Sequence, residues 1–144
     1  MPVTTKPPIW FWMAAVLLLL WAVTGVAAFH MDLAMTPAAM AKLDTFDQKL
    51  YADRPGWFIL VYGVAVWAGL IGSALLLVRR RWARWLYIAS LVAVVVMFGR
   101  MFLATDIIAV KGVAVATGFP LVIALIAAGE VWLASRAIRR GWIG

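Results

Sequence analysis

Four long apolar stretches, separated from one another by charged residues, constrain this chain more than any other feature of its sequence. They cover residues 9–29, 57–78, 85–103 and 113–135. The first holds 21 residues without a charge, which as an α-helix would be about 31 Å long, one hydrocarbon thickness. Because lipid offers backbone amides no hydrogen-bond partners, such stretches must satisfy them internally as helices. The sequence therefore predicts an all-α fold, a four-helix transmembrane bundle that forms one domain over residues 1–144.

A cleaved signal peptide is the alternative interpretation of the first stretch, because Val26-Ala27-Ala28 looks like a small-residue cleavage site. The stretch is, however, longer than the ~7–15 apolar residues of a signal core. Only Lys6 supplies a positive charge before it. We therefore expect a retained transmembrane helix.

The polar segment between the first and second spans is predicted to hold a short amphipathic helix. Thr36 followed by Pro37 is typical of a helix start, since the threonine side chain can cap the helix and proline fits its first position. Beyond Pro37 the apolar residues recur at helical spacing, and most charges fall on other faces. A helix over residues 37–52 is too short to cross the bilayer, so we expect it to lie in the interface.

Small residues recur every four positions along the second span. They are Ala65, Gly69 and Ser73, with Ala68 and Gly72 on an adjacent strip. Small side chains at this spacing let two helix backbones approach closely in lipid. The pattern predicts the packing helix of the bundle, and it is also compatible with a homo-oligomer.

The distribution of basic residues predicts the orientation of the spans. Eight of them flank the spans on the side of both termini, namely Lys6, Arg79, Arg80, Arg81, Arg84, Arg136, Arg139 and Arg140. Four lie on the other side, namely Lys42, Lys49, Arg54 and Lys111, together with all five aspartates. Seven of the nine tryptophans fall at predicted span ends, as interfacial anchors do. Because cytoplasmic loops carry the excess of Lys and Arg, we expect both termini in the cytoplasm.

Arg100 is the basic residue inside a predicted span, and an arginine at the bilayer centre would cost about 2.5–3.5 kcal/mol. It lies about 22 Å along the helix from Trp85, close to the outer boundary. One interpretation is that its side chain extends to the outer headgroups and pairs with an aspartate: Asp32, Asp53 or Asp106. The other is an anion site at the outer mouth of the bundle.

Glu130 is the acidic residue inside a predicted span, about 9 Å from the inner boundary at Arg136. Since successive spans alternate in direction, Glu130 and Arg100 lie at opposite depths. We expect Glu130 to pair with an arginine of the turn at residues 79–84 or to face the inner headgroups. A proton-coupled role is the alternative.

His30 and Asp32 stand together at the outer end of the first span, where a histidine beside a carboxylate can bind a metal or respond to pH. A zinc site needs more ligands than one histidine supplies, and the chain has no cysteine. We therefore interpret His30 as an interfacial residue and expect no metal and no cofactor. The sequence also lacks phosphate-loop, metal-hydrolase and dinucleotide-binding motifs. The net charge of +7 is explained by membrane topology, so nucleic-acid binding is not expected.

Several motifs give the chain a resemblance to a group of small bacterial four-span membrane proteins. They are the aromatic-rich first span, Met35-Thr36-Pro37, Leu76-Leu77-Val78-Arg79-Arg80-Arg81-Trp82-Ala83 and Arg140-Gly141-Trp142. Members of this group are often called hypothetical proteins or sugar transporters. The resemblance covers most of the chain and implies a bacterial inner membrane. Its motifs are topological, and no polar cluster at the membrane midplane supports the transporter label.

These observations lead us to expect a non-enzymatic integral membrane protein, an accessory or self-associating subunit of a membrane assembly. Its expected partners are the lipid bilayer and either further copies of the chain or a larger complex. The alternative is a small oligomeric transporter with Arg100 and Glu130 near opposite mouths. A third hypothesis is an enzyme or binding protein associated with lipid or quinone.

Overall fold

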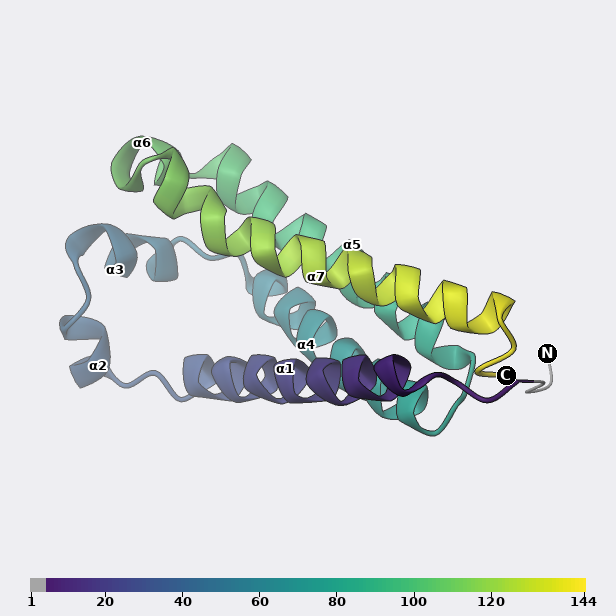
Figure 1. Ribbon diagram of the computed structural model, residues 1–144. Helices are drawn as coiled ribbons and strands as arrows, with labels where there is room; N and C mark the ends of the chain where they lie inside the picture. The colour runs from purple at the N-terminus through teal and green to yellow at the C-terminus, as the bar shows by residue number, and fades with distance from the viewer. Residues whose placement is uncertain (1–4) are drawn as a thin grey trace.

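Four helices long and apolar enough to cross a membrane form the body of the protein. Figure 1 shows them in the computed structural model, which describes residues 5–144. They are α1 (Ile9–Leu33), α4 (Gly56–Leu77), α5 (Trp82–Ala104) and α7 (Val113–Arg139). Within residues 5–144 every regular element is a helix. The predicted all-α, four-span fold is thus confirmed, with α1 and α7 each about one turn longer than their apolar stretches.

The outer surfaces of these helices are those of a protein solvated by lipid. All four expose large apolar side chains along their length, among them Leu17, Leu60, Val95 and Leu125. In water, an apolar surface of this extent would mark a large interaction site. Around four apolar helices it is the surface that contacts hydrocarbon chains.

The segment predicted as one interfacial helix over residues 37–52 forms two short helices, α2 (Pro37–Ala41) and α3 (Thr45–Ala52). The expected cap is present, because the Thr36 side chain accepts a hydrogen bond from the Ala39 amide at 3.1 Å. The break comes from a second cap: Asp44 Oδ1 accepts a hydrogen bond from the Asp47 amide at 2.7 Å and starts a new helix. The prediction of one continuous helix was therefore wrong.

The loop predicted between the third and fourth spans contains one helical turn, α6 (Ile107–Lys111). Gly112 joins it to α7 with a φ of 86°, which a residue with a side chain rarely adopts. Together α2, α3 and α6 form one end of the molecule, and both termini lie at the other (Figure 1).

The spans are arranged in the order α1–α4–α5–α7, since the main contacts join α1 to α4, α4 to α5 and α5 to α7. Near the termini all four helices contribute to one buried apolar cluster, which includes Phe11, Leu76, Tyr87 and Leu133. The second buried cluster lies further toward α3 and α6 and contains Phe58, Ala65, Ala93, Val94 and Met97, with Ile123 and Ala124 packed against it. No residue of α1 belongs to it. The helices therefore form a bundle that is packed at the terminal end and open between α1 and α7 at the other.

The small residues of α4 form the contact with α5. A Cβ atom added to Gly72 would lie 3.1 Å from Cδ1 of Tyr87, so the two backbones are as close as glycine allows. The Ser73 and Tyr87 hydroxyls are hydrogen-bonded at 2.8 Å, and both side chains are buried. Ser90 Oγ donates to the Ala65 carbonyl at 2.6 Å. The predicted packing strip therefore makes a contact between two helices of the same chain, α4 and α5.

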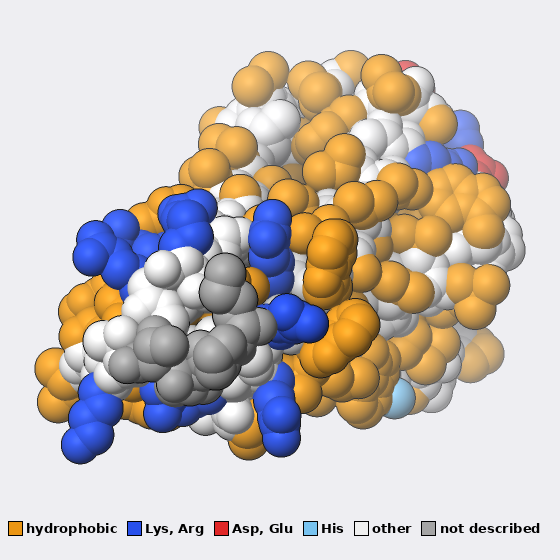
Figure 2. Space-filling view, turned by 90° about the vertical axis from the view of Figure 1, so that its right-hand side faces the viewer, with side chains coloured by type: hydrophobic (Ala, Val, Ile, Leu, Met, Phe, Trp, Pro, Cys, Tyr) orange, Lys and Arg blue, Asp and Glu red, His pale blue; other side chains and the backbone are white. Residues whose placement is uncertain are grey.

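The end that carries the termini is strongly basic. Figure 2 views this end and shows Lys and Arg side chains gathered around it, with hydrophobic side chains beyond. Its exposed basic residues are Lys6, Arg80, Arg81, Arg84, Arg139 and Arg140.

Arg79 joins three segments at the basic end. Its Nε donates to the Trp142 carbonyl at 2.7 Å, and its Nη2 donates to the Thr5 carbonyl at 2.9 Å. Trp142 itself is buried, with its ring edge-on to Trp10 and Phe11. The expectation that Trp142 serves as an interfacial anchor is therefore wrong: this ring packs inside the bundle.

The variant Gly72→Leu tests the close approach of α4 and α5. The new side chain has to displace the Tyr87 ring, so we expect a loss of about 1–3 kcal/mol in the free energy of unfolding. Unfolding in mixed micelles measures it. The matched control is Gly99→Leu, since an added Cβ there meets no atom within 4 Å. Equal stability of the two variants would contradict the described packing.

Candidate functional site

A groove of about 480 Å³ lies between α1 and α7, with α4 and α5 as its floor. Along α4 its lining extends from Phe58 to Gly69, which are eleven positions, or about 16 Å of helix, apart. Its position follows from the second apolar cluster, which joins α4, α5 and α7 but leaves α1 apart. The groove is thus built by the way the four spans splay.

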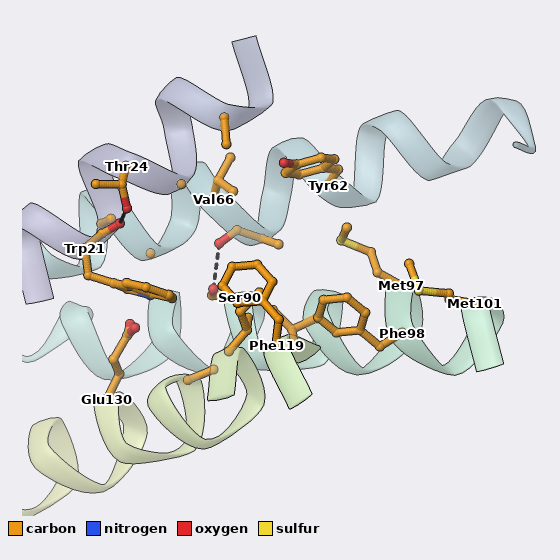
Figure 3. Close-up of a pocket in the computed structure, with 18 of the residues that line it drawn as sticks. Trp21, Thr24, Tyr62, Val66, Ser90, Met97, Phe98, Met101, Phe119 and Glu130 are labelled. Atoms are coloured by element: carbon orange, nitrogen blue, oxygen red, sulfur yellow. Dashed lines mark hydrogen bonds between the residues drawn. The ribbon is translucent and has the colours of Figure 1, made fainter. Parts of the chain in front are cut away.

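The walls of the groove are apolar and rich in aromatic rings. Each of the four spans contributes at least one ring or sulfur, as Figure 3 shows. The aromatic lining residues are Trp21, Phe58, Tyr62, Phe98 and Phe119. Small residues such as Gly25, Ala65 and Gly69 complete the lining. This combination forms an apolar cavity suited to an apolar or amphipathic group.

Glu130 is the acidic residue of the groove. Its side chain comes from α7 and lies across from Trp21 of α1 (Figure 3), and it is only 6% exposed. Within residues 5–144 its carboxyl group has neither a hydrogen bond nor an ion pair. The expected pairing with an arginine of the 79–84 turn, or exposure to the headgroups, is therefore wrong. Leu133 and Ala134, which are buried in the terminal cluster, separate Glu130 from the basic end.

Arg54, which was not among the predicted site residues, lies at the opposite end of the groove. Its Nη1 donates to both carboxylate oxygens of Asp32, at 3.1 and 2.9 Å. Its guanidinium also lies over the rings of Tyr51 and Phe58, 4.2 and 4.7 Å from the centroids. The positive charge at this end is therefore already neutralised.

Two aliphatic hydroxyl groups line the groove, and both donate to backbone carbonyls of helices. Thr24 Oγ1 donates to the Trp21 carbonyl at 2.6 Å, and Ser90 Oγ donates to the Ala65 carbonyl at 2.6 Å. Neither has a neighbouring base that would take up its proton, because the one acid of the groove, Glu130, forms no hydrogen bond with them. The Ser90 contact joins α5 to α4, whereas the Thr24 contact lies within α1, as hydroxyls in transmembrane helices commonly bond to their own helix.

Arg100 does not line the groove. Its Nη2 donates to the backbone carbonyl of Asp53 at 3.2 Å, at the end of the molecule formed by α2, α3 and α6. Asp53 was one of the three aspartates expected as an ion-pair partner, but the acceptor is its main-chain carbonyl and not its carboxylate. Arg100 and Glu130 are thus not two ends of one cavity.

The remaining predicted site residues are not brought together. His30 is exposed, with its ring edge-on to Trp67 at 5.9 Å, while the carboxylate of Asp32 binds Arg54. Asp106 is exposed just before α6, where its side chain forms no capping hydrogen bond. In the described part of the chain no three His, Asp or Glu side chains are grouped as metal ligands.

A salt-bridge cluster joins α6 to the start of α3. Lys111 Nζ lies 2.8 Å from Asp44 Oδ2 and 3.5 Å from Asp47 Oδ1. The hydrogen bond from Lys111 lowers the pKa of Asp44 below its ordinary 3.8, and the same contact raises the pKa of Lys111 above 10.5. The cluster holds the polar end together over the neutral pH range.

Sequence reasoning missed the groove because its lining comes from four separate spans. One signal was available: Trp21 and Trp67 are the two tryptophans that do not fall at predicted span ends. A tryptophan in the middle of a span has no interface to anchor to, and Trp21 lines the groove.

No known family model matches this sequence, and no curated protein or solved structure shows significant similarity to it. The four-span topology implied by the resemblance is present. The bacterial origin and the transporter label receive no support from these comparisons.

The salt-bridge cluster predicts a pH-dependent contact. Asp44 has a depressed pKa in the folded protein, so its contribution is complete above pH ~4 and is lost as the pH falls through the folded value. We expect spin labels at Ala52→Cys and Ala109→Cys to give a narrow distance distribution at pH 7 and a broader one at pH 3. In the Lys111→Met variant the distance distribution should be broad at both pH 7 and pH 3. The Lys42→Met variant, which changes an exposed lysine, should give the same distributions as the parent chain. A distribution that stays narrow at pH 3 would contradict the cluster.

Proposed function

We propose that this integral membrane protein binds a small amphipathic molecule in the groove between α1 and α7. The observation that carries the proposal is an apolar, aromatic-lined cavity within four apolar spans, with a single unpaired carboxyl group at its inner end. Ligand sites in proteins share this pattern, in which a few polar groups orient a ligand inside a mostly apolar pocket. This function corresponds to the third hypothesis from the sequence, a protein associated with lipid or quinone, as a binding protein and not as an enzyme.

The size of the groove favours a small molecule over a transmembrane helix. A helix 10–12 Å across with a 5.4 Å pitch fills about 500 Å³ per turn, so a cavity of 480 Å³ would hold about one turn. Drug-sized ligands occupy pockets of about 300–1,000 Å³. A headgroup and the first part of an alkyl or ring system match both this volume and the length along α4.

The proposed mode of action is binding without catalysis. Support comes from Thr24 and Ser90, whose hydroxyls donate to helix carbonyls and lie without a base beside them. Nucleophilic hydroxyls need an adjacent base that takes up their proton.

We further propose a bacterial inner membrane as the location, with the basic end and both termini in the cytoplasm. The arginines gathered at that end support this orientation, since cytoplasmic flanks carry the excess of positive charge (Figure 2). In this orientation Arg54 lies at the outer end of the groove and Glu130 near the inner end.

An accessory subunit of a membrane assembly is the second candidate function. Gly118 and Gly129 are both exposed on α7, and an added Cβ at either would meet no atom within 4 Å. They are eleven residues apart, about three turns, and so share one face of the helix. A partner helix would find two points of close approach there. The transporter alternative is less well supported, because Arg100 lies outside the groove and a packed cluster closes the terminal end.

The variant Ala28→Trp tests the groove as a binding site. Ala28 is exposed and lines the groove, so an indole there fills the space without displacing buried side chains. Native mass spectrometry of the protein released from its own membranes should detect a stoichiometric small molecule on the parent chain. We expect Ala28→Trp to lose it.

The matched control is Ala27→Trp, because Ala27 is equally exposed but does not line the groove. It should retain the molecule. Absence of any small molecule from the parent chain, or equal retention by both variants, would contradict the proposal. The same spectra report whether further copies or other proteins leave the membrane with the chain, which favours the second candidate.

A further inference from the structure

We infer that the ligand of the groove is a lipophilic organic cation, whose positive group pairs with Glu130 and whose apolar part lies against the aromatic walls. This inference rests on the proposed function and specifies the chemical class of the ligand. It depends on three features: an unpaired buried carboxyl group, an aromatic ring across from it and a neutralised arginine at the far end.

Glu130 is only 6% exposed, in a cavity whose lining is mostly apolar. A carboxylate in such a setting is costly unless a positive or hydrogen-bonding partner joins it. Within residues 5–144 the protein supplies none. The group nevertheless points into open space and not into packed side chains, so a ligand has room to supply the missing partner.

The nearest basic residues along the chain do not fill this role. Arg136 follows Glu130 by six residues, a rotation of 600° that puts it on a different face of α7. Its guanidinium lies over the ring of Trp132, 5.6 Å from the centroid. Arg54 lines the same groove but at the other end, where it is bound to Asp32.

The walls of the groove favour a cation for a second reason. The rings of Trp21, Tyr62 and Phe119 belong to three different helices and face the same space (Figure 3). Aromatic faces attract organic cations, and the attraction is stronger where water is excluded. An ammonium group can pair with the carboxylate and lie beside the Trp21 ring, while its apolar substituents contact the rings further along the groove.

An anionic ligand would find no comparable partner. Arg54 is the basic residue of the groove lining, and its guanidinium is already occupied by the carboxylate of Asp32 and by two aromatic rings. Charge complementarity therefore selects a positive headgroup over a fatty acid or a phosphate.

Three probes that share one apolar cage and differ in charge test the inference. They are 1-adamantylammonium, 1-adamantanol and adamantane-1-carboxylate. Binding is measured by equilibrium dialysis against the protein in nanodiscs of zwitterionic lipid, with empty nanodiscs subtracted. We expect the ammonium to bind at least about tenfold more tightly than the alcohol or the carboxylate. Glu130→Gln should remove this preference and leave the affinity for the alcohol unchanged.

The control is Asp106→Asn, which removes the same charge at an exposed position outside the groove and should leave all three affinities unchanged. Equal binding of the three probes to the parent chain would overturn the cation inference while leaving the groove as a binding site. An unchanged preference in Glu130→Gln would likewise overturn it. Failure of every probe to bind, together with no ligand on the native protein, would overturn the proposed function as well.

Discussion

The close contact between α4 and α5 is the interaction on which the rest of the structure depends. Between helices in lipid the hydrophobic effect gives little net attraction, so association relies on backbone proximity and polar contacts. This pair has both, with Gly72 against the ring of Tyr87 and the Ser73 hydroxyl bonded to the Tyr87 hydroxyl at 2.8 Å. The other two spans are attached mainly to this pair, α1 through α4 and α7 through α5.

The groove is a consequence of that arrangement. Because α1 and α7 are held from opposite sides of the central pair, they meet in the packed cluster near the termini and separate toward α3 and α6 (Figure 1). Glu130 lies on α7 just beyond the packed cluster, where the space begins to open. The same geometry therefore creates the cavity and leaves a buried carboxyl group facing it.

The sequence was sufficient to predict what depends on local pattern. The four spans, the Thr36 cap and the packing role of Gly72 follow from apolar length, capping chemistry and small-residue spacing, and the structure contains all three. The groove could not be predicted, since its walls join residues as distant in sequence as Trp21 and Glu130. The prediction for the environment of Glu130 was wrong for the same reason. The sequence indicates the depth of Glu130 along its helix, but the direction of its side chain depends on how the neighbouring spans splay.

The divergence of α1 and α7 is the central claim, and distances between spin labels test it directly. The chain has no cysteine, so single labels can be placed without background. One pair, Ile9→Cys with Arg139→Cys, lies at the terminal end, and the other, Leu33→Cys with Val113→Cys, lies at the opposite end; all four positions are exposed. If α1 and α7 diverge as described, the second pair gives a clearly longer distance in lipid nanodiscs. Equal distances, or a shorter one for the second pair, would mean a closed bundle without a groove and would contradict it.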